Sequence, residues 1–166
     1  RWHRTAFTEL LSRDVNGSIF GFMGFGRIGQ AIAKRALSFN GKIIYHTRSR
    51  LPSKIEKIYQ ARYVEKSQLL ESADVIILIL PHSDETHHFI GETELGLMKN
   101  TSVLVNMARG GIVDDCALIK ALRRGDIYSL IYWKLLRYLE KAPAIRRFNG
   151  NTHLARPWKN GSGFSR

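Results

Sequence analysis

Residues 18–29 read SIFGFMGFGRIG, a short apolar run followed by Gly24, Gly26 and Gly29 in the spacing G-x-G-x-x-G. The aromatic and β-branched residues of 18–23 predict a strand, and the apolar spacing of 28–39 predicts a helix. A glycine turn between a strand and a helix is typical of a loop that binds the pyrophosphate of a dinucleotide. The alternative is a tight turn without a ligand, and the flanking elements make it the weaker interpretation.

Beyond the loop, segments typical of strands and helices continue to alternate along the chain. Strands are expected at 42–47, 61–64, 75–80, 102–106 and 127–133, and helices at 53–60, 67–72, 92–98, 114–124 and 134–141. Gly125 suits the C-terminal cap of the helix at 114–124. This alternation predicts an α/β fold, a Rossmann-type doubly wound parallel sheet with its ligand at the carboxyl ends of the strands.

The length of 166 residues, 44% of them hydrophobic, suits a single cofactor-binding domain. We expect a leading helix or linker at 1–13, the NAD(P)-binding domain at 14–133 and a divergent basic tail at 134–166. The tail lacks apolar periodicity and is expected to be loosely ordered. The first residue is not methionine, so the sequence is expected to be a fragment or a processed product.

The formal net charge of +12 is concentrated near the end of the chain. Residues 1–126 contain 18 lysines and arginines against 13 acids, whereas residues 127–166 contain 8 against 1. A basic tail is more often a solvated segment than a specific nucleic-acid-binding site. Nucleic-acid binding is therefore the weakest of the functions considered.

Other composition features point to a cytoplasmic protein without a membrane segment. The longest apolar run, at 75–81, is too short to span a bilayer. Cys116 is the only cysteine, which excludes a disulfide framework and a cysteine metal site. His82, His87 and His88 lie close together but lack a metal-ligand pattern, so no metal is expected.

The residues that follow the second predicted strand are candidates for binding the adenosine ribose of the cofactor. NAD-binding members of this fold carry an acid there, yet residues 42–55 contain no aspartate or glutamate. The chain has Thr47, Arg48, Ser49 and Arg50 instead, and guanidinium groups suit a 2′-phosphate. NADP(H) is therefore favoured and NAD(H) remains possible. The alternative is that the two arginines belong to a solvated loop.

Arg109 follows the strand expected at 102–106, at the ligand edge of the sheet. An arginine there can hold a substrate carboxylate and polarise the neighbouring carbonyl as charge builds on its oxygen. An ordinary surface arginine is an equally good interpretation of the residues alone.

Four motifs together resemble the cofactor-binding domain of the D-isomer-specific 2-hydroxyacid dehydrogenases, and within them the glyoxylate/hydroxypyruvate reductases. The resemblance covers approximately residues 14–126. The motifs are GFGRIGQ at 24–30, YHTRSR at 45–50, LPHSDET at 80–86 and NMARGGIVD at 106–114.

The resemblance implies NADPH-dependent reduction of a 2-keto acid to a D-2-hydroxy acid, and a homodimer formed through this domain. It places Arg109 on the substrate carboxylate as the catalytic residue. It also implies a set of cofactor contacts along four loops, made by Gly24, Gly26, Arg27, Ile28, Gly29, Thr47, Arg48, Ser49, Arg50, Leu80, Pro81, Thr86, Met107 and Ala108.

The chain departs from the family pattern after Asp126. The family's Glu-Pro pair is absent, and His153 stands in NTHLA rather than in the Pro-His context of the family's general acid. The hundred or so residues that build most of the family's substrate domain are also missing. Impaired turnover is therefore expected, and a non-catalytic nucleotide-binding or dimerisation module is the alternative function.

Overall fold

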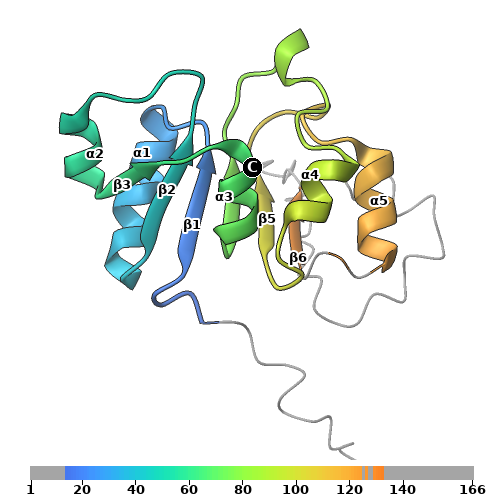
Figure 1. The fold of residues 1–166 in the computed structure, drawn as a ribbon, viewed down its shortest axis with the longest axis horizontal. Helices are drawn as coiled ribbons and strands as arrows, with labels where there is room; N and C mark the ends of the chain where they lie inside the picture. Colours follow the sequence, from blue (N-terminus) through green and yellow to red (C-terminus); the bar gives the residue numbers. More distant parts are fainter. Residues whose placement is uncertain (1–13, 125, 127–128, 133–166) are drawn as a thin grey trace, which may run out of the picture.

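The structure is a computed structural model that describes residues 14–124, 126 and 129–132. Its strands are β1 (Ile19–Met23), β2 (Lys42–His46), β3 (Ala61–Tyr63), β4 (Val75–Leu78), β5 (Val103–Asn106) and β6 (Ser129–Tyr132). Its α-helices are α1 (Arg27–Ala36), α2 (Ser53–Tyr59), α3 (Lys66–Ser72), α4 (Glu92–Leu97) and α5 (Asp115–Arg124), and two 3₁₀ turns are η2 (Leu37–Phe39) and η3 (Asp84–Thr86) (Figure 1).

All the strand pairs are parallel, and the sheet order is β3-β2-β1-β4-β5-β6. This is the order of a Rossmann sheet, so the predicted fold class is confirmed. β1 lies between β2 and β4, and the chain crosses from one half of the sheet to the other at that point. The predicted extra strand also exists as β6, which pairs with β5.

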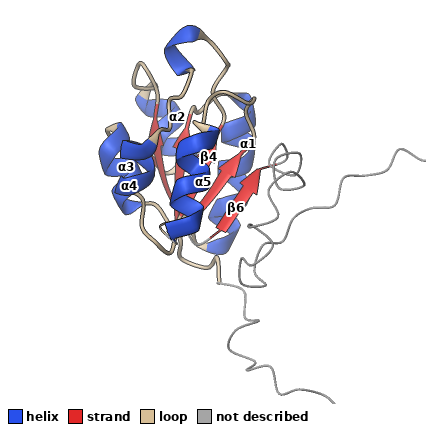
Figure 2. Ribbon diagram, turned by 90° about the vertical axis from the view of Figure 1, so that its right-hand side faces the viewer, coloured by secondary structure: helices blue, strands red, loops and turns tan. Residues whose placement is uncertain are grey.

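Helices cover both faces of the sheet, and Figure 2 shows the strands between them. One core cluster packs α1 against the aromatic face of β1 and β2, with Phe20, Phe22 and Tyr45 buried. The other packs α3, α4 and α5 against the opposite face, where Met23 and Ile76 are fully buried. Side chains alternate between these two clusters along β1, as the period of a strand requires.

Several predicted boundaries differ from the structure by a few residues. The helix predicted at 28–39 ends as an α-helix at Ala36 and continues as the 3₁₀ turn η2, after which Asn40 takes a left-handed conformation (φ 54°). The strand predicted at 75–80 ends at Leu78, so Ile79 and Leu80 belong to the following loop. Gly125, the helix predicted at 134–141, and the segments 1–13 and 134–166 lie outside the described residues.

Within the described part of the chain, no helix combines the length and the apolar character that crossing a bilayer requires.

Asp114 caps the N-terminus of α5 and gives the fold a pH-dependent contact. Its Oδ1 accepts hydrogen bonds from the N–H groups of Cys116 (2.8 Å) and Ala117 (3.2 Å). The bond from Ala117, with that from Cys116, lowers the pKa of the Asp114 carboxyl below its ordinary 3.8. The carboxylate therefore stabilises the fold above the unfolded-state pKa, and this stabilisation is lost as the pH falls through the lower folded-state pKa.

We expect Asp114→Ala to lower the free energy of unfolding by about 1 kcal/mol at neutral pH, because the cap is lost. The difference from the wild type should shrink as the pH falls below 3.8. Urea unfolding at a series of pH values measures this. Asp114→Asn is the control, since an asparagine caps a helix without titrating. A pH-independent difference for Asp114→Ala would contradict the prediction.

Candidate cofactor-binding site

A cleft of about 710 Å³ lies at the carboxyl ends of the central strands, beside the glycine loop. It brings together seven of the residues predicted to bind the cofactor, namely Gly24, Gly26, Thr47, Arg48, Leu80, Pro81 and Thr86. The cleft is thus formed by the loops after β1, β2 and β4, which the sheet order places side by side. Its position is where ligands bind in open α/β sheets.

The glycine loop leaves room for a phosphate next to the start of α1. Gly24 has φ +90°, and its N–H donates to the carbonyl of His46 (3.0 Å). Gly26 is the N-terminal cap residue of α1, and a Cβ built on it would meet no atom within 4 Å. The N–H groups in the first turn of a helix have no intrahelical acceptor, and this turn contains no acidic residue. These residues therefore fit a bound pyrophosphate.

The other predicted members of the glycine loop lie around this opening without lining the cleft. Arg27 and Ile28 are exposed on the first turn of α1, and 59% of Ile28 is accessible to solvent. Gly29 is buried, and a Cβ there would lie 3.1 Å from the carbonyl oxygen of Gly24. The third glycine thus permits close packing of the helix on the loop, as the motif predicts.

The loop after β2 holds its two arginines in different ways. The Arg48 guanidinium pairs with Glu85 of η3 (Nη1 to Oε2, 3.3 Å) and lines the cleft. Arg50 makes two hydrogen bonds to Glu56 of α2, each of 2.9 Å, and does not line the cleft. Ser49 is exposed and accepts, through its carbonyl, a hydrogen bond from the Thr47 hydroxyl (2.7 Å). The structure therefore brings Thr47 and Arg48, but not Ser49 or Arg50, into the cleft wall.

The loop after β4 forms the opposite wall and is closed on itself by Thr86. The Thr86 hydroxyl donates to the carbonyl of Pro81 (2.7 Å) and accepts from the N–H of Ser83 (2.8 Å). Phe89 lies further along this wall, and Lys66 of α3 donates to the Phe89 carbonyl (3.1 Å) and lies 4.2 Å from the centre of its ring. Phe89 was not predicted, because it follows the motif by three residues.

Met107, Ala108 and Arg109 follow β5 at the same edge of the sheet but do not line the cleft. Met107 and Arg109 are exposed, and the N–H of Ala108 donates to Oδ1 of Asn106 (3.0 Å). Asn106 itself is buried, and its Nδ2 has no hydrogen-bond partner among the described residues. Buried donors in folded proteins nearly always have a hydrogen-bond partner, which can be ordered water.

Several other residues that line the cleft were not predicted to contact the cofactor, although most of them lie within the four sequence motifs. They are Met23, His46, Ile79, Ser83, Asp84, Glu85 and Phe89. The position of Glu85 in the cleft could have been predicted. The strands β2 and β4 both flank β1, and the loops that follow them carry opposite charges.

The three neighbouring histidines lie beside the cleft rather than in its wall. The rings of His87 and His88 stack at 3.9 Å, and a Cβ on Gly111 would lie 2.9 Å from Nε2 of His82. No group of three or more potential metal ligands suits a metal ion in the part of the chain that the structure describes. Cys116 is exposed.

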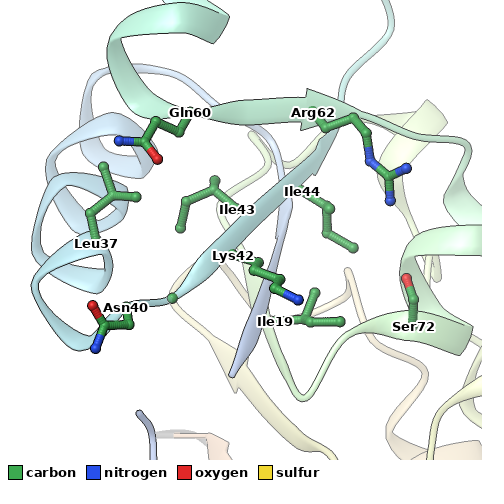
Figure 3. A pocket seen from close by; sticks show the side chains of 10 residues that line it. Ile19, Leu37, Asn40, Lys42, Ile43, Ile44, Gln60, Arg62 and Ser72 are labelled. Atoms are coloured by element: carbon green, nitrogen blue, oxygen red, sulfur yellow. The ribbon is translucent and has the colours of Figure 1, made fainter. Parts of the chain in front are cut away.

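A second hollow, of about 590 Å³, lies at the amino-terminal ends of β1, β2 and β3. Figure 3 shows Ile19, Lys42, Ile44 and Arg62 among the side chains that line it. Because the strands are parallel, this hollow and the glycine loop lie at opposite ends of them. It therefore contributes nothing to the cofactor cleft.

The sequence model described as "D-isomer specific 2-hydroxyacid dehydrogenase, NAD binding domain" matches residues 1–132. The chain belongs to this family. A glyoxylate reductase of Thermococcus gammatolerans is 48% identical over 126 residues, which are 76% of this chain and 36% of that protein. The glyoxylate/hydroxypyruvate reductase B of an Enterobacter species is 43% identical over 129 residues, 77% of this chain and 40% of the relative.

Solved structures of the D-isomer specific 2-hydroxyacid dehydrogenase family have the same fold. A glyoxylate reductase from Paecilomyes thermophila superposes with a TM-score of 0.69 at 43% identity, over 72% of this chain and 36% of that chain. A D-lactate dehydrogenase from Aquifex aeolicus, solved with NAD and lactic acid, gives 0.70 at 34% identity, over 82% and 41%. The chain thus spans little more than a third of the length of these family members, and the part it matches is the NAD-binding domain.

Proposed function

We propose that this chain is the NADP(H)-binding part of a reductase that converts 2-keto acids such as glyoxylate or hydroxypyruvate into D-2-hydroxy acids. The observation that carries the proposal is the cleft beside the glycine loop, with Arg48 in its wall and no acid at residues 42–55. Family membership and the names of the relatives support the reaction class.

The cofactor, when bound, supplies the hydride. The N–H groups at the start of α1 bind its pyrophosphate, and Arg48 binds the 2′-phosphate of the adenosine. Leu80 and Pro81 pack along the dinucleotide, while Met107 and Ala108 contact it from the loop after β5. Arg109 holds the substrate carboxylate and stabilises the negative charge that builds on the keto oxygen.

The reaction also needs a general acid that donates a proton to the keto oxygen. The proposal includes no such acid among the residues that line the cleft. The alternative function is a non-catalytic nucleotide-binding or dimerisation module. We propose in addition that the protein forms a homodimer through this domain and is cytoplasmic, the latter from its single cysteine.

Fluorescence titration of the chain with NADPH and NADH, followed by an NADPH oxidation assay with glyoxylate and hydroxypyruvate, tests this proposal. We expect NADPH to bind at least about tenfold more tightly than NADH, since a bidentate charged contact is added. Slow oxidation that Arg109→Gln abolishes would support the reductase. Binding without oxidation would support the non-catalytic module, and failure to bind either dinucleotide would refute both functions.

A further inference from the structure

We propose that Glu85 determines the cofactor selectivity of the cleft by competing with the 2′-phosphate for Arg48, and that Arg50 is a structural residue that takes no part in binding. This inference rests on the proposed function and assigns its selectivity to particular side chains. It is carried by the different ways in which the two arginines are paired.

The Arg48–Glu85 ion pair bridges the two walls of the cleft. Arg48 follows β2 and Glu85 lies in η3 after β4, so the pair joins loops on either side of β1. Its single contact of 3.3 Å is solvent-exposed, with 89% of the Arg48 side chain and 72% of the Glu85 side chain accessible. Exposed pairs of this kind are weak, whereas a phosphate dianion can accept two hydrogen bonds from one guanidinium group. A 2′-phosphate can therefore displace Glu85 from Arg48.

Arg50 is held far more firmly. Its Nε and Nη2 donate to the two carboxylate oxygens of Glu56, and only 11% of the Glu56 side chain is exposed. Glu56 also accepts a hydrogen bond from the hydroxyl of the fully buried Tyr45 (2.7 Å). The bonds from Arg50 and then from Tyr45 lower the pKa of the Glu56 carboxyl.

The Tyr45 hydroxyl in turn accepts the N–H of Leu51 (3.0 Å), so Arg50, Glu56 and Tyr45 fix the loop between β2 and α2. Moving Arg50 to a ligand would leave the Glu56 carboxylate without its charged partner in a place with little access to water. Arg50 therefore stabilises the turn between β2 and α2 through Glu56 instead of binding the phosphate.

The Glu85 carboxylate therefore weakens the binding of NADPH and not that of NADH. Glu85 lines the cleft, and a 2′-phosphate that binds Arg48 must first break the pair between Arg48 and Glu85. NADH carries a hydroxyl at that place and has no need of Arg48. Removal of the Glu85 charge should therefore tighten the binding of NADPH and leave that of NADH nearly unchanged.

The test is a fluorescence titration of the full chain with NADPH and NADH for the wild type, Glu85→Gln, Arg48→Gln and the double variant. We expect Glu85→Gln to tighten NADPH binding about three- to tenfold and to change NADH binding less than about twofold, given the strength of exposed charge pairs. Arg48→Gln should weaken NADPH binding about tenfold. In the Arg48→Gln background, the effect of Glu85→Gln should disappear, because Glu85 acts through Arg48.

Glu71→Gln is the matched control, since it removes an exposed carboxylate from α3 and so makes the same change in net charge. It should leave both affinities unchanged. Arg50→Gln should lower the midpoint of thermal unfolding while the ratio of the two affinities stays at the wild-type value.

The outcomes separate this inference from the proposed function. An NADPH affinity that Glu85→Gln leaves unchanged, or tightens equally in the Arg48→Gln background, would overturn the role of Glu85 alone. A lost NADPH preference in Arg50→Gln would overturn the structural role of Arg50. Absence of NADPH and NADH binding in every variant would overturn both the inference and the proposed function.

Discussion

Replacing Gly24 with alanine is expected to destabilise the fold by about 3 kcal/mol or more and to abolish dinucleotide binding. Gly24 has φ +90°, a backbone conformation that residues with a side chain rarely adopt. An added Cβ would lie 2.4 Å from the carbonyl oxygen of Ile79 and 3.0 Å from its carbonyl carbon. Both are backbone atoms, so the neighbouring chain must move to relieve the overlap.

Thermal or urea unfolding of Gly24→Ala measures this cost. Gly96→Ala is the matched control, because a Cβ at that position in α4 would meet nothing within 4 Å. The control should be neutral or slightly stabilising, since alanine favours a helix more than glycine does. Wild-type stability of Gly24→Ala would show that the loop does not need this conformation.

Gly26→Ala is expected to weaken dinucleotide binding about tenfold to hundredfold while stability stays close to that of the wild type. The residue has φ −75° and open space around the added Cβ, so the free protein accepts alanine without strain. The same space is where a pyrophosphate must approach the start of α1. The new methyl group would therefore collide with the ligand and not with the protein.

Fluorescence titration with NADPH measures the loss, and the midpoint of thermal unfolding serves as the internal control. Undiminished NADPH binding by Gly26→Ala would mean that the pyrophosphate lies elsewhere. A large fall in stability would instead mean that the loop is packed more tightly than the structure has it.

The fold was largely predictable because each strand and helix carries its own local signal. The strand at β1 and the start of α1 followed from apolar periodicity around the glycines, and the parallel, doubly wound sheet followed from the alternation of strands and helices. The ends of elements were less accurate. The predicted strand 75–80 continued two residues too far, because Ile79 and Leu80 are as apolar as the buried strand before them.

The residues that reach the cleft could be predicted where their position follows from the end of a strand. They could not be predicted where their position depends on the conformation of a loop. Thr47, Arg48, Leu80 and Pro81 reach one cleft because β2 and β4 both neighbour β1. The pairing of Arg50 with Glu56 could not be foreseen, since it requires the turn at Pro52 to bring together residues six apart. The roles of the predicted site residues stay predictions until ligand binding is measured.

The central place of β1 in the sheet has a consequence for engineering the protein. Arg48 lies beyond β2, on one side of β1, whereas Arg109 lies beyond β5, on the other side and one strand further away. Residues without shared contacts contribute additively to free energies. If Arg48 and Arg109 have the proposed roles, changes of nucleotide preference made on one flank should therefore combine with changes of acid substrate made on the other as independent factors.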